Sequence, residues 1–145
     1  MSMKTWINYG IGVCTSELEI KSLEAIKALV ALSPCLEKDL KEYFEDCEIE
    51  SPEIADYLEY DEDCRSGLAY LLQRVINDVE NLMFTACDDY EGRIYLIYQP
   101  SYPWDMTDKE KSLSEADIKD ILAKYLSMVT DDDLDVGEIE AENFG

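Results

Sequence analysis

Residues 81–104 read NLMFTACDDYEGRIYLIYQPSYPW, and this stretch decides the fold. Apolar and aromatic residues alternate with period two, which predicts two strands at 82–87 and 93–99. Gly92 can adopt the positive φ that the intervening turn needs. Pro100 ends the second strand because proline cannot donate to a ladder. The stretch therefore predicts a β-hairpin.

Two further segments, 4–14 and 134–141, alternate in the same way and predict strands of the same antiparallel sheet. In the first segment, Gly10 and Gly12 leave one face without side chains, so a neighbouring backbone can approach closely. In the second segment, the alternation changes phase at Gly137. One extra residue in the strand, a β-bulge, would explain this change.

Helical patterns separate the first strand from the hairpin. Residues 16–19 have capping-box spacing, and Ser33-Pro34 and Ser51-Pro52 each resemble an N-cap followed by the first helical residue. Residues 61–63 precede the longest expected helix, and another helix is expected near 114–129. The expected buried face of the longest helix comprises Leu68, Leu71, Leu72, Val75, Ile76 and Val79.

The expected order is strand, helices, strand, strand, helix, strand. This is the βαββαβ, or ferredoxin-like, plan with an expanded helical first crossover. We therefore predict an α+β fold with a four-stranded antiparallel sheet, in a single domain over residues 1–145. An irregular α+β arrangement is the alternative. We expect Trp104 to pin its loop to the core rather than to contact a ligand.

Charge restricts the possible partners. The chain has 145 residues and a net charge of −22, from 34 acidic against 12 basic residues. Such a charge favours basic partners and opposes direct binding to nucleic acid or to an anionic membrane surface. The longest apolar run, 28–32, is too short to span a bilayer. The first residues do not have the pattern of a signal peptide, so we expect a cytoplasmic protein.

Catalytic chemistry has little support in the sequence. The chain has no histidine, the commonest general base and metal ligand, so Ser–His and Cys–His pairs are excluded within it. We therefore predict a non-enzymatic protein without a cofactor. The cysteines lack metal-ligand spacing and are expected to be reduced thiols. They are Cys14, Cys35, Cys47, Cys64 and Cys87.

Acidic residues concentrate in residues 37–63. This segment has thirteen acidic residues against two lysines, a net charge of −11, and three tyrosines interrupt it. Carboxylates along helices can imitate phosphates, while tyrosines supply apolar contacts. The alternative is a solvated face that keeps the protein soluble. The predicted partner-binding residues are Glu42, Tyr43, Glu45, Asp46, Glu53, Asp56, Tyr57, Glu59, Tyr60, Asp61, Glu62 and Asp63.

Residues 131–142 add seven acidic residues and no base. Asp131, Asp133, Asp135 and Glu142 fall at positions 1, 3, 5 and 12 of an EF-hand loop. Position 6, however, is valine instead of the required glycine. A calcium- or metal-responsive module is therefore an alternative function, and we assign no metal ligand.

In overall character the chain resembles the small acidic proteins with which phages and mobile elements oppose host defence, including anti-restriction and anti-CRISPR proteins. The stretch from Tyr102-Pro103-Trp104 to Lys124-Tyr125-Leu126, with the ending 142–145, resembles small proteins of Gram-positive mobile elements. This resemblance implies a bacterial cytosol and a host-defence target, and it assigns no functional residue.

Charge and resemblance together predict an inhibitor that acts by DNA mimicry. Its partner would be a basic nucleic-acid-binding protein, a host-defence nuclease, whose nucleic-acid-binding surface it occupies. An immunity protein for a toxic nuclease is an alternative with the same chemistry.

Overall fold

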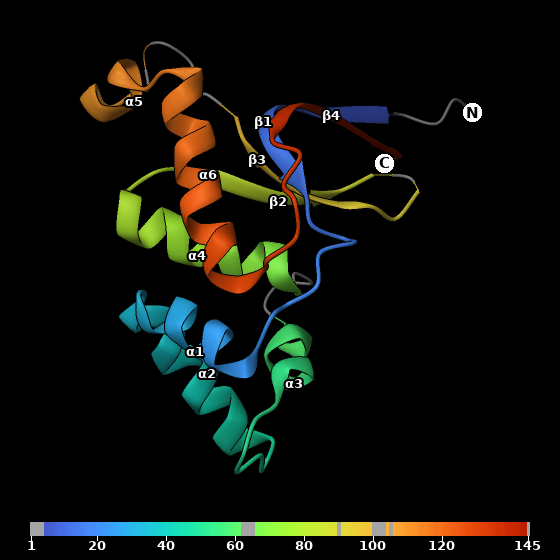
Figure 1. Ribbon diagram of the computed structural model, residues 1–145, viewed down its shortest axis with the longest axis vertical. Helices are drawn as coiled ribbons and strands as arrows, with labels where there is room; N and C mark the ends of the chain where they lie inside the picture. Colours follow the sequence, from blue (N-terminus) through green and yellow to red (C-terminus); the bar gives the residue numbers. More distant parts are fainter. Residues whose placement is uncertain (1–4, 62–65, 90, 100–103, 105, 145) are drawn as a thin grey trace.

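The computed structural model describes residues 5–61, 66–89, 91–99, 104 and 106–144 (Figure 1). The elements follow in the order β1 (Thr5–Cys14), α1 (Leu23–Ala31), α2 (Pro34–Asp46), α3 (Ile54–Glu59), α4 (Leu68–Glu80), β2 (Phe84–Asp88), β3 (Ile94–Tyr98), α5 (Asp108–Ser112), α6 (Glu115–Val129) and β4 (Gly137–Phe144). The predicted α+β class and the four-stranded antiparallel sheet are confirmed.

The strand order of the sheet is β2-β3-β1-β4. β2 and β3 form the predicted hairpin, with Phe84 opposite Tyr98. β1 pairs with β3 on one side and with β4 on the other. β1 and β4, the first and last strands along the chain, thus lie side by side in the sheet.

The predicted β-bulge at Gly137 is wrong. Pairing between β1 and β4 runs without interruption from Thr5 opposite Phe144 to Gly12 opposite Gly137. The strand begins at Gly137, and the apolar residues that precede it belong to the connecting loop, where they pack against the main core. The change of phase therefore marks the end of a loop instead of an extra residue in a strand.

The close approach expected at the two glycines of β1 is confirmed. A Cβ atom on Gly10 would lie 2.1 Å from the carbonyl oxygen of Tyr98, and one on Gly12 would lie 2.3 Å from that of Leu96. The Ile97 side chain also lies over both glycines and is fully buried. Side chains alternate across a strand, so Ile97 belongs to a second, smaller cluster on the opposite face from Leu96.

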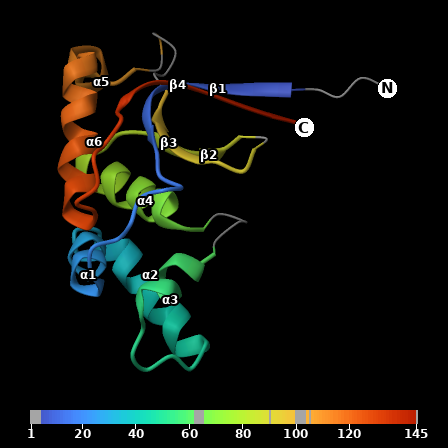
Figure 2. The same cartoon turned by 45° about the vertical axis from the view of Figure 1, so that its right-hand side comes forward.

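Helices pack in two tiers beside the sheet. α4 packs against β2 and β3, and α6 packs against β1. α1 packs against α4 and α6, while α2 and α3 pack against α1. In both views, α1, α2 and α3 form a lobe at the end of the molecule away from the sheet (Figures 1 and 2). One cluster of buried apolar residues joins this lobe to the sheet.

Side chains cap several helices, and one of the predicted caps is confirmed. Ser33 caps α2 as predicted, its hydroxyl accepting a hydrogen bond from the Leu36 amide at 3.4 Å. Ser114 and Asp117 form a capping box at the start of α6. The proposed start at Ser16 is wrong, because Ser22 caps α1 at Leu23. Ser16 instead accepts a hydrogen bond from the Ile94 amide of β3.

Other boundaries also differ from expectation. Ser51-Pro52 does not start a helix; α3 begins at Ile54, with a capping box between Glu53 and Asp56. Val79 is 44% exposed and lies outside the buried face of α4, whereas the other predicted residues of that face are buried. Within the described residues α6 is the longest helix, with 15 residues against 13 in α4, and α5 was not predicted.

Trp104 does not pin its loop to the core, since its side chain is 78% exposed. The expectation followed from the size of the indole ring, which usually favours burial. Across the described ranges, the helices are too short or too polar to cross a membrane.

Candidate acidic binding surface

The acidic segment folds as α2, a loop and α3. Leu36, Leu40 and Phe44 of α2 face the core, so the charged residues between them are left outside. Among the predicted carboxylates, Asp56 is half-buried, and Glu62 and Asp63 lie outside the described residues. The remaining six are exposed: Glu42, Glu45, Asp46, Glu53, Glu59 and Asp61.

The carboxylates of α2 lie in two stripes. Residues four apart on a helix lie on the same side, so Glu37, Lys41 and Glu45 form one stripe of α2. Glu42 and Asp46 form the next stripe around the helix, outside the first. The predicted surface is therefore divided by α2 into two parts with different surroundings.

The first part is a cleft of about 1070 Å³ between α1, α2 and the loop that follows α2. Its apolar lining comes from Val30, Leu40, Phe44, Ile49, Pro52 and Tyr57. Its charged lining comes from Lys27, Glu37, Lys41, Glu45, Glu48 and Glu50. With four carboxylates and two lysines, the rim of this acidic cleft has a net charge of −2.

The end of α2 shapes one wall of the acidic cleft. The Ile49 amide donates to the Phe44 carbonyl at 2.8 Å, and the intervening Glu48 has a φ of 58°. This is a Schellman motif, in which glycine usually occupies the left-handed position. It turns the chain back so that Ile49 lies in the cleft lining. A residue with a Cβ at this position costs about 1 kcal/mol, and here that residue is glutamate.

Two of the three predicted tyrosines belong to the core. Tyr57 is 9% exposed and Tyr60 is 6% exposed. The Tyr57 ring packs edge-on against Phe44 with centroids 5.0 Å apart, and Tyr60 packs in the same way against Tyr43 at 5.2 Å. The expectation of a surface with tyrosines between its carboxylates is therefore corrected. These rings stabilise the packing of α2 on α3.

The second part of the acidic surface surrounds Tyr43, which is half-buried. Its own burial raises the pKa of Tyr43, and the neighbouring Cys47 thiol and the charges of Glu59 and Asp56 raise it further. These causes place Tyr43 of α2 beside the carboxylates of α3. Tyr43 is thus the one predicted tyrosine with a partly accessible ring beside carboxylates.

No family model, curated protein or solved structure matches the chain. Each residue of the surface is therefore assigned from its exposure, its charge and its place in the fold. Sequence reasoning missed Glu37, Glu48, Ile49 and Glu50 of the acidic cleft. The four-residue spacing of Glu37, Lys41 and Glu45 could have predicted the side of the cleft that α2 forms. The side that α1 forms could not be predicted from the acidic segment, because α1 lies outside it.

The second acidic segment has structural uses. Lys21 lies 3.7 Å from Asp131, and the Asp132 carboxylate accepts a hydrogen bond from the Glu19 amide at 2.8 Å. Residues 137–144 form β4, which is incompatible with an EF-hand loop that ends at Glu142. Over the described ranges, no three histidine, cysteine or acidic side chains are grouped to hold a metal ion.

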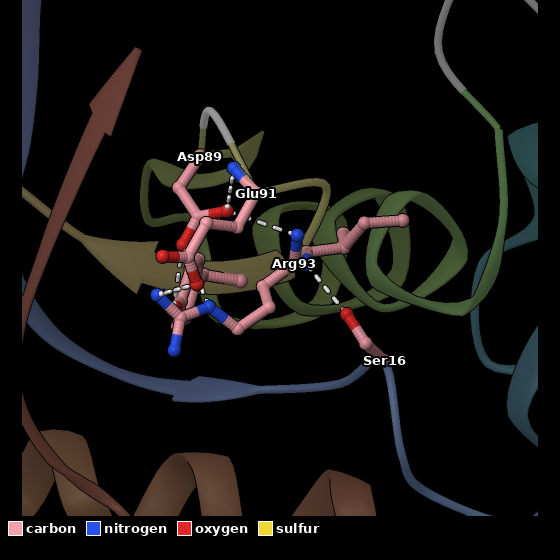
Figure 3. Close-up of polar contacts among 6 residues, drawn as sticks. Ser16, Asp89, Glu91 and Arg93 are labelled. Carbon is pink, nitrogen blue, oxygen red and sulfur yellow. Dashed lines mark hydrogen bonds and ion pairs between the residues drawn. The ribbon is translucent and has the colours of Figure 1, made fainter.

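A buried carboxylate also lies in the turn between β2 and β3 (Figure 3). Asp89 accepts hydrogen bonds from the backbone amides of Glu91 and Arg93, each at 3.0 Å, and from the Arg93 Nε at 2.9 Å. The Tyr95 hydroxyl donates to it at 3.1 Å. Burial opposes ionisation, but these hydrogen bonds lower the pKa of Asp89. Both oxygens are satisfied within the protein, so Asp89 holds the turn.

Proposed function

We propose that the protein is a non-enzymatic inhibitor that occupies the basic, nucleic-acid-binding surface of another protein by imitating phosphates. The observation that carries this proposal is the group of exposed carboxylates that α2 and α3 hold in fixed positions. The resemblance to anti-restriction and anti-CRISPR proteins favours a host-defence nuclease as the partner. An immunity protein would use the same surface and would differ only in its target.

The spacing of the carboxylates supports mimicry. Residues four apart on an α-helix are about 6 Å apart along its axis, and phosphates recur about every 3.4 Å of axis along one DNA strand. Glu42 and Asp46, four residues apart, therefore lie at a spacing close to two phosphate steps. Within the described residues, one carboxylate of α2 forms an ion pair with a basic side chain. It is Asp39, which lies 2.9 Å from Arg74.

The electrostatic field of the whole protein affects the rate of association with a partner. A net charge of −22 attracts a basic surface before contact and accelerates encounter, and dissolved salt screens this attraction. We also propose a cytoplasmic location, and the free thiols of the four described cysteines support such a reducing compartment.

We further propose that the sheet follows the ferredoxin-like plan. β3 lies between β1 and β2, and β4 pairs with the outer side of β1. A split βαβ unit, with the hairpin returning into its gap, is consistent with this order. The helices α1 to α4 then form the expanded first crossover, and this crossover carries the acidic surface.

The proposed function is tested by competition. The immobilised protein is incubated with bacterial lysate, with and without excess duplex DNA or RNA, and the captured proteins are identified. We expect nucleic-acid-binding proteins that the competitor releases. For a purified captured nuclease, the protein should inhibit cleavage and displace labelled substrate. Simultaneous binding of the protein and nucleic acid, without mutual weakening, would show that mimicry is wrong.

The variant for this test must leave the capping box of α3 intact, so Glu53 and Asp56 are kept. Reversal of four exposed carboxylates to lysine should slow association strongly, whereas the same reversals should leave the fold unchanged. The changes are Glu42→Lys, Glu45→Lys, Asp46→Lys and Glu59→Lys.

A further inference from the structure

The acidic cleft combines apolar and charged residues in one lining. Leu40, Phe44 and Tyr57 belong to the buried core and also line the cleft, while Ile49 is half-buried in it. Contact between a partner and this lining would remove apolar surface from water, which charge mimicry alone does not do. A complementary occupant would have an apolar stripe as well as positive charge.

We infer that the acidic cleft binds a basic amphipathic helix of the partner protein. This inference rests on the proposed function and names the element of the partner that the surface takes. Helix-in-groove recognition places apolar side chains at i, i+3 or i+4, and i+7 against a hydrophobic groove. The carboxylates at the rim then pair with lysine or arginine residues that flank the apolar stripe.

The two carboxylates of the α2 stripe set the spacing of these charges. Glu37 and Glu45 are eight residues apart, which corresponds to about 12 Å along the helix axis. A helix that lies along α2 would match them with basic residues seven or eight positions apart. Lys41 lies between the two carboxylates, so the matching helix should have no basic residue at the midpoint of this spacing.

Other occupants fit less well. In the described part of the chain, every buried polar side-chain atom has a hydrogen-bond partner, so no buried polar side chain is left to orient a small molecule in the cleft. Nucleic acid would be repelled by the carboxylates of the rim. Glu48 at the left-handed position adds a carboxylate to the rim where glycine would be less strained.

Labelled synthetic peptides test the inference by fluorescence anisotropy. The probe is a 15-residue amphipathic helix with leucines at i, i+3, i+7 and i+10 and arginines eight positions apart on the flank. Its control has the same composition, scrambled to destroy the apolar stripe. We expect the amphipathic peptide to bind more tightly than its control, and to retain part of its affinity when added salt screens the charges.

A matched pair of variants separates the acidic cleft from total charge. Glu45→Lys with Glu50→Lys changes the cleft rim, while Glu42→Lys with Asp46→Lys makes the same change in net charge outside it. We expect the cleft pair to weaken peptide binding about tenfold and the outside pair to weaken it much less. Ile49→Ser, a change at a half-buried position, should also weaken binding. Thermal melting verifies that each variant is folded.

The outcomes separate this inference from the proposed function. Equal weakening by both pairs, or equal binding of the scrambled peptide, would overturn the cleft as a helix site, while inhibition of a nuclease by charge would still stand. Competition between the protein and nucleic acid that is insensitive to the cleft pair would also overturn it. Absence of any competition would instead overturn the proposed function.

Discussion

The residue at the left-handed end of α2 provides a quantitative test of the fold. Glu48 has a φ of 58° in the turn that follows α2, and glycine at such a position avoids the contact between Cβ and the backbone. We expect Glu48→Gly to stabilise the protein. The gain is about 1 kcal/mol, because relief of about 1–2 kcal/mol is partly offset by the greater freedom of glycine in the unfolded chain.

Two control variants isolate this effect. Glu48→Ala removes the same carboxylate but keeps a Cβ, so it should retain the backbone strain. Glu42→Gly lies in the interior of the same helix, where glycine should destabilise by about 1 kcal/mol. Glycine substitutions within α2 and in the turn that follows it are thus expected to have opposite effects on stability.

The assay is urea unfolding followed by far-UV circular dichroism, together with thermal melting. For a chain of 145 residues, about 1 kcal/mol corresponds to a rise in Tm of about 4 °C. If Glu48→Gly melts below the unmodified protein while Glu48→Ala does not, then either Glu48 is not left-handed or its left-handed backbone costs no free energy. In the peptide assay, both variants should bind more weakly because both lack the carboxylate.

Three further predictions test other parts of the structure. Gly12→Ala should destabilise the protein strongly in urea unfolding, because the new Cβ would lie 2.3 Å from a backbone oxygen. A smaller residue at position 97 should not restore stability, because the clash is with the backbone. The pKa of Asp89 is lowered in the folded state, so its contribution to stability is present above its ordinary pKa and is lost as pH falls through the folded value. The stability difference between the protein and Asp89→Asn should therefore shrink on acidification, and a constant difference in urea midpoints from pH 7 to pH 2.5 would contradict this. Burial and nearby aspartates raise the pKa of the Cys87 thiol to about 11, so iodoacetamide at pH 8 should alkylate exposed Cys35 well before Cys87, as mass spectrometry of peptides can show.

Sequence patterns predicted the fold where the deciding partners are local. The hairpin follows from alternation and a turn within a few residues, and the cap at Ser33 needs only the amide three residues later. Ser16 had an equally good local pattern, but its hydroxyl is used by the amide of Ile94, which is distant in sequence. Local spacing cannot reveal such a competitor.

The candidate surface was predictable in charge but not in shape. Counting acidic residues identified α2 and α3, because exposed carboxylates follow from the polarity of those positions. The tyrosines were misplaced because Tyr57 and Tyr60 combine polar neighbours with rings that pack on α2. The acidic cleft joins α1, α2 and a loop, so it depends on tertiary packing that no single segment encodes.

The free edge of β4 has a consequence for how the protein behaves in concentrated solution. Glu138, Glu140 and Glu142 are exposed at every second position of this strand, and among the described strands only β1 is hydrogen-bonded to β4. At neutral pH, three like charges on an edge strand prevent a second copy from adding its own β4. Near the isoelectric point of about 4.1, the net charge is zero and the repulsion between whole molecules disappears. Acid would then promote edge-to-edge growth of the sheet, so the carboxylates of β4 also act as the protein's safeguard against self-assembly.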